Sequence, residues 1–280
     1  MENYTHYGKQ ADVFKHLVLC EVLHNEKPVI YIDTNSASAM YQLEHTPEQD
    51  YGIYHFLRKA STNYKLENSH YFKLESEAMQ KGCYYGSPAL AMKVLGNNAN
   101  KYYFFDLERK SLDNVDWFAK QEHLDSQIFI RKCDSTKGVM ELLPTLPTTT
   151  FIHIDPYEID KEGIAGQTYF DVFIRATQLG IKCLLWYGFM TVDDKSGLDK
   201  YIVSYLQKSG IKNVVSSKLI MNSISESVTD CNPGILGSGL LASNLSDKSN
   251  RQLLDFSKLL VNVYKSSQYR GYDGSLYNEL

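Results

Sequence analysis

The chain has 280 residues, of which 43% are hydrophobic and 22% charged, and its formal net charge is −4. This composition is typical of a globular protein that can bury a large core, and it lacks the apolar run of about 20 residues that crosses a bilayer. The negative charge argues against a protein that coats nucleic acid through many phosphate contacts, and five scattered cysteines predict neither a disulfide framework nor a metal site.

The first residues, 1–6, lack the basic and apolar regions of a signal peptide, so we expect a cytoplasmic protein without membrane contact. Further along, five apolar runs predict central strands, and two later runs predict a closing antiparallel pair. Helical patterns precede or separate these runs, as in a doubly wound sheet. The five central runs are 28–33, 102–106, 127–132, 150–155 and 181–187, the later pair is 214–220 and 239–243, and the helical patterns include 11–24, 87–95, 136–143 and 169–179.

A polar, tyrosine-rich stretch lies between the first two strands and is too long for an ordinary connection. We expect residues 44–84 to form a small helical insert in a core made of residues 1–43 and 85–280. The predicted fold class is α/β. It is a Rossmann-like, mostly parallel sheet of seven strands with an antiparallel strand, similar to the sheet of class I S-adenosylmethionine-dependent methyltransferases.

The run 151–157 ends a buried strand abruptly in Asp155, Pro156 and Tyr157. Open α/β sheets bind ligands at the carboxyl ends of their strands, where Asp155 could accept a hydrogen bond from an amine and Tyr157 could stack on a flat heterocycle. The alternative is a strand-to-loop cap with a surface aromatic. His153 shares the face of Asp155 deeper in the sheet, and we interpret it as a core histidine.

Carboxylates also end three successive strands, at Asp33, Asp106 and Asp134. In a doubly wound fold the loop after Asp33 would run beneath a cofactor, Asp106 would bind ribose hydroxyls, and Asp134 would hold an adenine amine. Each acid taken alone is also typical of a turn or a helix cap.

Several segments occur in an order and spacing that resemble the RlmJ family, over nearly the whole chain. Members of that family are 23S rRNA adenine-N6 methyltransferases, also described in connection with the use of external DNA as a nutrient. The blocks Ala-Asp-Val-Phe-Lys-His and Tyr-Tyr-Gly-Ser-Pro are specific to it. The segments are 8–16, 31–34, 41–43, 84–88, 154–157, 185–187 and 237–239.

The resemblance implies S-adenosylmethionine as cofactor and no metal. Lys15 and His16, before the first strand, would reach its methionine end, Asp106 would bind its ribose, and Asp134 and Ser135 would hold its adenine ring. An ordinary solvated helix face is the alternative for Lys15 and His16.

Other implied positions surround the same cofactor. Ser87 resembles a family serine near it, Asp33 begins the loop beneath it, and Asn35 replaces a family histidine that touches it. Asp155 matches the catalytic aspartate, assisted by Tyr157 and Lys15, and also lies at the cofactor. Tyr4 matches an aromatic that contacts RNA.

The implied partner is 23S rRNA, naked or in a partly assembled large subunit, and we expect a monomer. Orientation would be the main catalytic device, with Asp155 accepting one hydrogen of the adenine amine and Tyr157 stacking on the flipped base.

Two departures from the family leave alternatives open. Only one proline follows Asp155, where the family has two, and the segment 35–39 lacks the expected glycines. These features favour a non-catalytic or weakened nucleic-acid-binding homologue connected to the use of external DNA. A DNA adenine-N6 methyltransferase is the third hypothesis.

Overall fold

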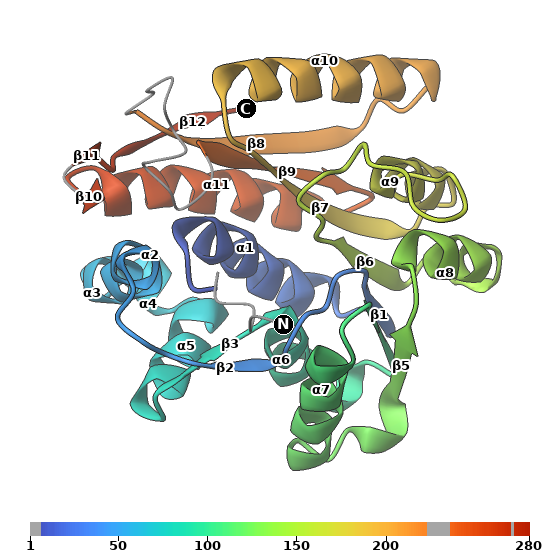
Figure 1. The fold of residues 1–280 in the computed structure, drawn as a ribbon, viewed down its shortest axis with the longest axis horizontal. Helices are drawn as coiled ribbons and strands as arrows, with labels where there is room; N and C mark the ends of the chain where they lie inside the picture. Colours follow the sequence, from blue (N-terminus) through green and yellow to red (C-terminus); the bar gives the residue numbers. More distant parts are fainter. Residues whose placement is uncertain (1–6, 223–235, 270–271) are drawn as a thin grey trace.

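The computed structural model describes residues 7–222, 236–269 and 272–280, and an eight-stranded sheet runs through its centre (Figure 1). Five neighbouring strands are parallel, β9 is antiparallel to both β7 and β8, and β12 is antiparallel to β8. The strand order is β12 (Leu276–Glu279), β8 (Val214–Met221), β9 (Gly237–Ser243), β7 (Lys182–Phe189), β6 (Thr150–Ile154), β1 (Ile30–Asp33), β4 (Lys101–Asp106) and β5 (Ile128–Lys132). The predicted Rossmann-like α/β class, with a mainly parallel sheet and an antiparallel strand, is confirmed.

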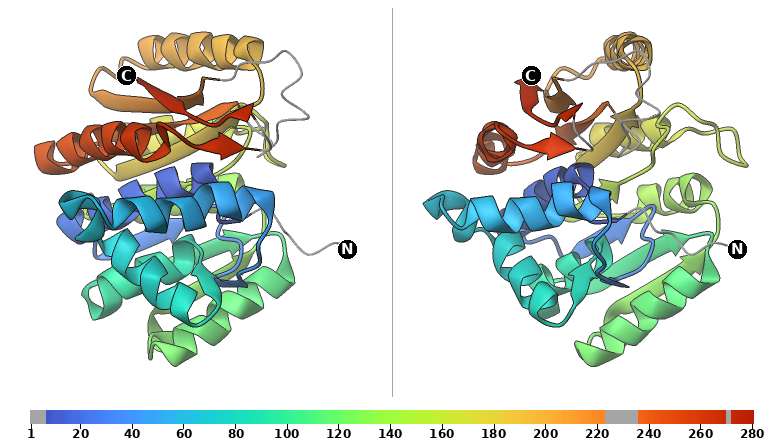
Figure 2. Two further views of the ribbon diagram at one scale, coloured as in Figure 1. Left: turned by 90° about the vertical axis from the view of Figure 1, so that its left-hand side faces the viewer. Right: turned by 60° about the vertical axis from the view of Figure 1, so that its left-hand side comes forward.

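Helices cover the sheet and account for its apolar strands (Figure 2). All five residues of β6 are buried, as expected for a parallel strand with covered faces. In one layer α1 (Gln10–Glu26) contacts α6 (Ser87–Leu95) and α11 (Asp247–Tyr264), while α7 (Arg109–Gln121) contacts α6. Elsewhere α8 (Ser135–Leu142) contacts α9 (Tyr169–Gln178), and both α9 and α10 (Val192–Lys208) contact β7.

The stretch between the first two strands of the large sheet contains a small antiparallel pair, β2 (Met40–Gln42) and β3 (Cys83–Tyr85), and α6 follows β3. Between β2 and β3 lie four helices and a π-helical turn, which as a group contact α1 and α11 and bury Phe56, Leu66 and Tyr71. These elements are α2 (Pro47–Gln49), η1 (Asp50–Tyr54), α3 (His55–Ala60), α4 (Tyr64–Glu67) and α5 (His70–Gln80). The division of the chain into a core and an insert stays a prediction.

The remaining elements are short. They are the 3-10 turns η2 (Gly96–Asn98), η3 (Asp125–Gln127) and η4 (Leu143–Thr145), and the hairpin strands β10 (Gln268–Tyr269) and β11 (Tyr272–Asp273). None of the helices in the described ranges is long and apolar enough to cross a membrane.

Two sequence expectations about the sheet were wrong. The run 127–132 does not form a central strand, because β5 lies at the edge and its last residues, Arg131 and Lys132, are exposed. The sheet also has an eighth strand, since β12 adds to β8. Ion pairs stabilise β12 at this position: Lys195 Nζ lies 2.9 Å from Glu279, and Lys218 is also paired with Glu279.

Glu26 joins three elements at the end of α1. Its carboxylate accepts hydrogen bonds from the backbone N–H of Ser246 (2.9 Å) and the hydroxyl of Ser249 at the start of α11, and it lies 3.0 Å from Lys182 Nζ on β7. Burial raises the pKa of Glu26, but these bonds outweigh it and leave the pKa below its ordinary value. The folded state therefore favours the ionised carboxylate.

We expect Glu26→Gln to lower the free energy of unfolding by about 1–3 kcal/mol at neutral pH. Because the folded pKa is depressed, this contribution is complete above the unfolded pKa of about 4.3 and is lost as the pH falls through the folded pKa. Urea unfolding of the wild type and of Glu26→Gln, at neutral pH and near pH 3, measures this contribution to the free energy of unfolding. A stability gap that does not shrink in acid would contradict the assignment.

Candidate active site

A cavity of about 390 Å³ opens where the parallel strands of the large sheet end. The first turns of α1, the loop after β1, the start of α6 and the ends of β4, β6 and β7 all contribute to its wall. The lining residues are Tyr7, Lys9, Ala11, Asp12, Lys15, His16, Asn35, Ser36, Ala37, Tyr41, Tyr84, Gly86, Ser87, Asp106, Glu108, Asp155, Tyr157 and Trp186. Seven of the predicted site residues therefore meet in one place.

Asp155 and Lys15 form a buried ion pair in this wall. The Lys15 ammonium donates to both carboxylate oxygens, at 2.8 and 3.1 Å, and the two side chains are only 11% and 7% exposed. Lys15 also lies 3.1 Å from Asp12 and 4.7 Å from the ring centre of Trp186. Burial raises the pKa of Asp155 above its ordinary value, although Lys15 opposes that rise.

His16, next along α1, is buried and uncharged. Its Nδ1 lies 2.8 Å from the Tyr84 hydroxyl. Burial, with the charge of Lys15 nearby, lowers its pKa well below the ordinary value. His16 thus presents a neutral imidazole to the cavity, while Lys15 provides a positive charge.

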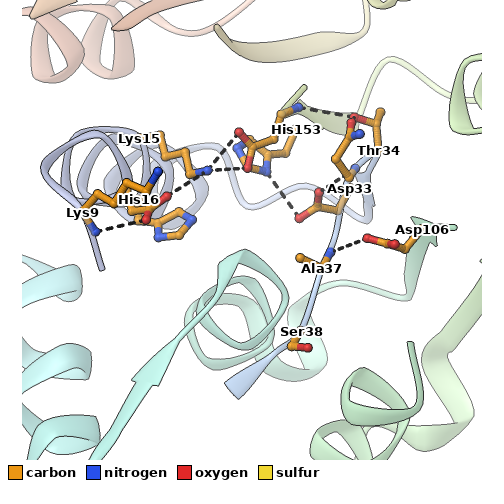
Figure 3. A network of polar contacts seen from close by, with 12 residues as sticks. Lys9, Lys15, His16, Asp33, Thr34, Ala37, Ser38, Asp106 and His153 are labelled. Carbon is orange, nitrogen blue, oxygen red and sulfur yellow. Dashed lines mark hydrogen bonds and ion pairs between the residues drawn. The ribbon is translucent and has the colours of Figure 1, made fainter. Parts of the chain in front are cut away.

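The loop after β1 is held against the end of β4 by Asp106 (Figure 3). One carboxylate oxygen accepts from the Ala37 N–H at 2.8 Å and the other from the Glu108 N–H at 2.7 Å. Burial raises the pKa of Asp106 despite these bonds. The carboxylate retains further lone pairs, so it can also accept hydrogen bonds from a ligand in the cavity.

Glycine allows this loop to approach the start of α6. A Cβ atom on Gly86 would lie 2.2 Å from the carbonyl oxygen of Ser38, and the Gly86 N–H donates to the Ala39 carbonyl at 2.9 Å. Ser87 follows at the first position of α6 and lines the cavity. The Tyr-Tyr-Gly-Ser-Pro block therefore shapes the wall through its backbone.

Three predicted residues do not line the cavity. Asp33 is fully buried behind the loop and accepts from the Tyr31 hydroxyl at 3.0 Å. Asp134 caps α8 and also accepts from the Ile164 N–H at 2.8 Å. Ser135 donates to the Tyr169 hydroxyl at 3.2 Å. Their polar groups make these local hydrogen bonds, and the cofactor roles that the resemblance implies for them stay predictions.

Two other predicted residues have distinct positions. Asn35 lines the cavity and donates to the Tyr169 hydroxyl at 2.9 Å. Tyr157 is 42% exposed, and its ring lies beside Gly188 of β7, where an added Cβ would lie 2.7 Å from the ring. Burial of the rest of the side chain raises its pKa to about 12, so the phenol stays neutral. Tyr4 lies outside the described residues.

Sequence reasoning missed the other aromatic walls of the cavity. Tyr7 and Tyr41 stack with ring centres 4.5 Å apart, and Tyr84 lies 6.2 Å from Tyr7. Trp186 lies beneath Lys15. Tyr41, Tyr84 and Trp186 belong to the quoted family segments, which was the available signal, but nothing in the sequence showed that segments so far apart meet. No cluster of His, Cys, Asp or Glu within the described ranges could hold a metal ion.

Comparison with known proteins gives matches over most of the chain. It is 25% identical over 262 residues to the ribosomal RNA large subunit methyltransferase J of Haemophilus influenzae, covering 85% of this chain and 84% of that protein. It is 24% identical over 261 residues to the protein of the same name from Escherichia coli K12, covering 89% and 88%. No protein-family model matches the chain.

A solved structure shares the fold. The crystal structure of a Legionella pneumophila protein, described under the family name DUF519, matches with a TM-score of 0.74 at 20% identity and covers 98% of this chain and 97% of that one. The resemblance to the RlmJ family that the sequence motifs predict is therefore confirmed, at about 25% identity over most of the chain.

Proposed function

We propose that the chain is an S-adenosylmethionine-dependent methyltransferase that acts on the N6 amine of adenine in 23S rRNA. One observation carries the proposal: Asp155, at the carboxyl end of β6, presents a nearly buried carboxylate in a cavity beside the half-exposed ring of Tyr157. The names of the two curated relatives support the substrate class.

The residues present suit the cofactor. Asp106 can accept hydrogen bonds from ribose hydroxyls. Because Gly86 approaches the loop after β1 closely, backbone groups form this part of the cavity wall. Lys15 and neutral His16 would face the methionine end. Because Asp134 and Ser135 do not line the cavity, we assign the adenine end to Asn35 and its neighbouring backbone. The cofactor supplies an electrophilic methyl group on a sulfonium.

The protein's own contribution is orientation and charge. An exocyclic adenine amine is a poor nucleophile, so it must be held in line with the methyl group. Asp155 would accept a hydrogen bond from one N–H of the amine and stabilise the positive charge that develops on nitrogen as the methyl group is transferred from the sulfonium sulfur. Tyr157 stacks on the extruded base. Lys15 already donates to both oxygens of Asp155, but each oxygen retains a lone pair that can accept an N–H of the amine.

Cofactor binding is the first test, by calorimetry of S-adenosylmethionine with the wild type and with Asp106→Ala. We expect micromolar binding that the variant loses, because both the ribose acceptor and the anchor of the loop are removed. Asp113→Ala is the control, since Asp113 is exposed on α7 and pairs only with Arg109 among its described ion pairs. Binding that survives Asp106→Ala unchanged would contradict the site.

A second function has one observation in its favour. Both oxygens of Asp155 already accept from Lys15, and this arrangement also fits a nucleic-acid-binding homologue without turnover, connected to handling of external DNA. Transfer of labelled methyl groups from S-adenosylmethionine separates the two. Nucleic-acid binding without transfer would establish the second function.

The substrate is proposed at the level of class. Methyl transfer to naked 23S rRNA, to assembled large subunits and to adenine-containing DNA would be compared, and we expect naked or partly assembled RNA to be preferred. A preference for DNA would instead identify a DNA adenine methyltransferase. We further propose that the protein acts as a monomer in the cytoplasm.

A further inference from the structure

A second cavity, of about 630 Å³, lies outside the candidate active site. Its walls come from two parts of the chain that are far apart in the sequence, namely the elements α2, η1 and α3 and the segment that follows α11. None of its lining residues also lines the first cavity, the one that contains Asp155. The residues that the argument uses are Asp50, Tyr51, His55, Arg58, Lys59 and Gln268.

Two cations line this second cavity. Arg58 and Lys59 are neighbours on α3, and both side chains are exposed. The one acid among the described lining residues, Asp50, lies 2.7 Å from His45 Nδ1, and no described acid forms an ion pair with either cation. The cavity therefore presents two positive charges to solvent, although the chain as a whole is acidic.

His55 holds Arg58 in place without neutralising it. The buried imidazole donates from Nε2 to the Val263 carbonyl at 2.9 Å, which leaves Nδ1 to accept from the Arg58 guanidinium at 3.3 Å. Burial lowers the pKa of His55, as do the charges of Arg58 and Lys59, although the bond to Val263 opposes this. Arg58 therefore keeps its full charge, and its other N–H groups can bond to an anion.

The second cavity lies at the same edge of the sheet as the first. Phe189 ends β7 at that edge and pairs with Gly237, which also pairs with Ile220 on β8. The next residue of β8, Met221, pairs with Leu276, three residues after β11. The hairpin of β10 and β11, whose strand β10 lines the second cavity, is thus close to the carboxyl end of β7.

The turn η1 connects the two cavities. The Tyr51 hydroxyl donates to the Gly274 carbonyl at 2.6 Å, which joins η1 to the segment after β11. Two residues further along, the Ile53 N–H donates to the Gly8 carbonyl at 2.9 Å. Tyr51 lines the second cavity, and Lys9, next to Gly8, lines the first. One helical turn therefore lies between them, and a helix with its side chains is about 10–12 Å across.

We propose that the second cavity binds backbone phosphates of the RNA strand whose adenine enters the first cavity, with Arg58 and Lys59 as the phosphate ligands. The inference rests on the proposed function and adds a second contact to the same substrate. Arginine bonds to phosphate through two parallel N–H groups, and lysine adds a point charge. A single strand crosses the width of one helix within a few nucleotides. Phosphate contacts position a strand without reading its bases, so Asp155 and Tyr157 would still select the adenine.

Binding is measured by fluorescence anisotropy of a labelled single-stranded RNA of about 20 nucleotides, at several salt concentrations. Replacing both Arg58→Gln and Lys59→Gln should weaken binding about tenfold at about 0.1 M salt. It should also reduce the slope of log affinity against log salt by about 1.4, because each contact to a single strand contributes about 0.7.

The matched control replaces Lys248→Gln and Arg251→Gln. It removes the same two residue types from exposed positions on α11, near Ser246, which bonds to Glu26 at the opposite end of α1 from the first cavity. Equal weakening in the two double variants, or an unchanged salt slope in the variant of Arg58 and Lys59, overturns the proposal. If that variant does not fold, Lys59→Gln alone should still reduce the slope by about 0.7.

Two further measurements separate this inference from the proposed function. A wild type that binds S-adenosylmethionine in calorimetry but binds no RNA overturns the inference and leaves the cofactor site standing. RNA binding that depends on Arg58 and Lys59, without methyl transfer, supports the second cavity as a phosphate site and contradicts the enzyme. Calorimetry with inorganic phosphate distinguishes a strand from a free ion: saturable phosphate binding, with RNA affinity unchanged in the double variant, overturns the proposal.

Discussion

Replacing Asp155 by asparagine is expected to slow methyl transfer by about 10²–10³-fold while leaving the affinity for S-adenosylmethionine close to that of the wild type. The amide nitrogen would face the substrate amine or Lys15 as a second donor, and the carboxylate charge that stabilises the reacting nitrogen would be lost. Cofactor affinity should persist, because Asp106, His16 and the loop after β1 are untouched.

Single-turnover transfer to naked 23S rRNA with saturating cofactor measures this rate. Asp113→Asn makes the same chemical change on an exposed face of α7 and should leave the rate unaltered. Circular dichroism of both variants checks that they fold. We expect Asp155→Asn to fold, because Lys15 retains Asp12 as an ion-pair partner. A rate within tenfold of the wild type would show that another group accepts the amine hydrogen.

The sequence sufficed to predict that several of the candidate residues meet at one edge of the sheet. Parallel strands end at one edge of a doubly wound sheet, so Asp106 and Asp155, which follow their strands by no more than one residue, had to come close together. Lys15 and His16 were harder to place, because a helix before the first strand has no fixed relation to that edge. Their roles came from the family resemblance, and the structure places them in the same cavity wall.

Side-chain direction explains what the sequence did not predict. Asp33 ends its strand as Asp106 does, yet it points into the sheet layer and pairs with His153. Asp134 accepts from the backbone of its own helix and from the Ile164 N–H, and it does not line the cavity. β5 lies at the edge because, among the described strands, it pairs only with β4. The apolar pattern of β5 does not encode this long-range pairing.

Gly52→Ala is expected to disturb the site from outside it. Gly52 lies in η1, where an added Cβ would meet only backbone, 2.1 Å from the Gly8 carbonyl oxygen and 2.8 Å from Lys9 Cα. The Ile53 N–H also donates to that carbonyl at 2.9 Å. Because backbone atoms cannot rotate away, the segment leading into α1 must shift, and we expect the free energy of unfolding to fall by at least about 2 kcal/mol.

The shift should also weaken binding of S-adenosylmethionine, since Lys9 lines the cavity and the start of α1 carries Lys15. Gly197→Ala is the matched control. Nothing lies within 4 Å of a Cβ at Gly197 in α10, so alanine there should raise stability by about 1 kcal/mol through helix propensity alone and leave binding unchanged. Urea unfolding and calorimetry of the two variants measure both effects. Equal behaviour of the two would mean that the packing of η1 on the start of α1 does not support the cavity, and that α1 is held in place by its contacts with α6 and α11.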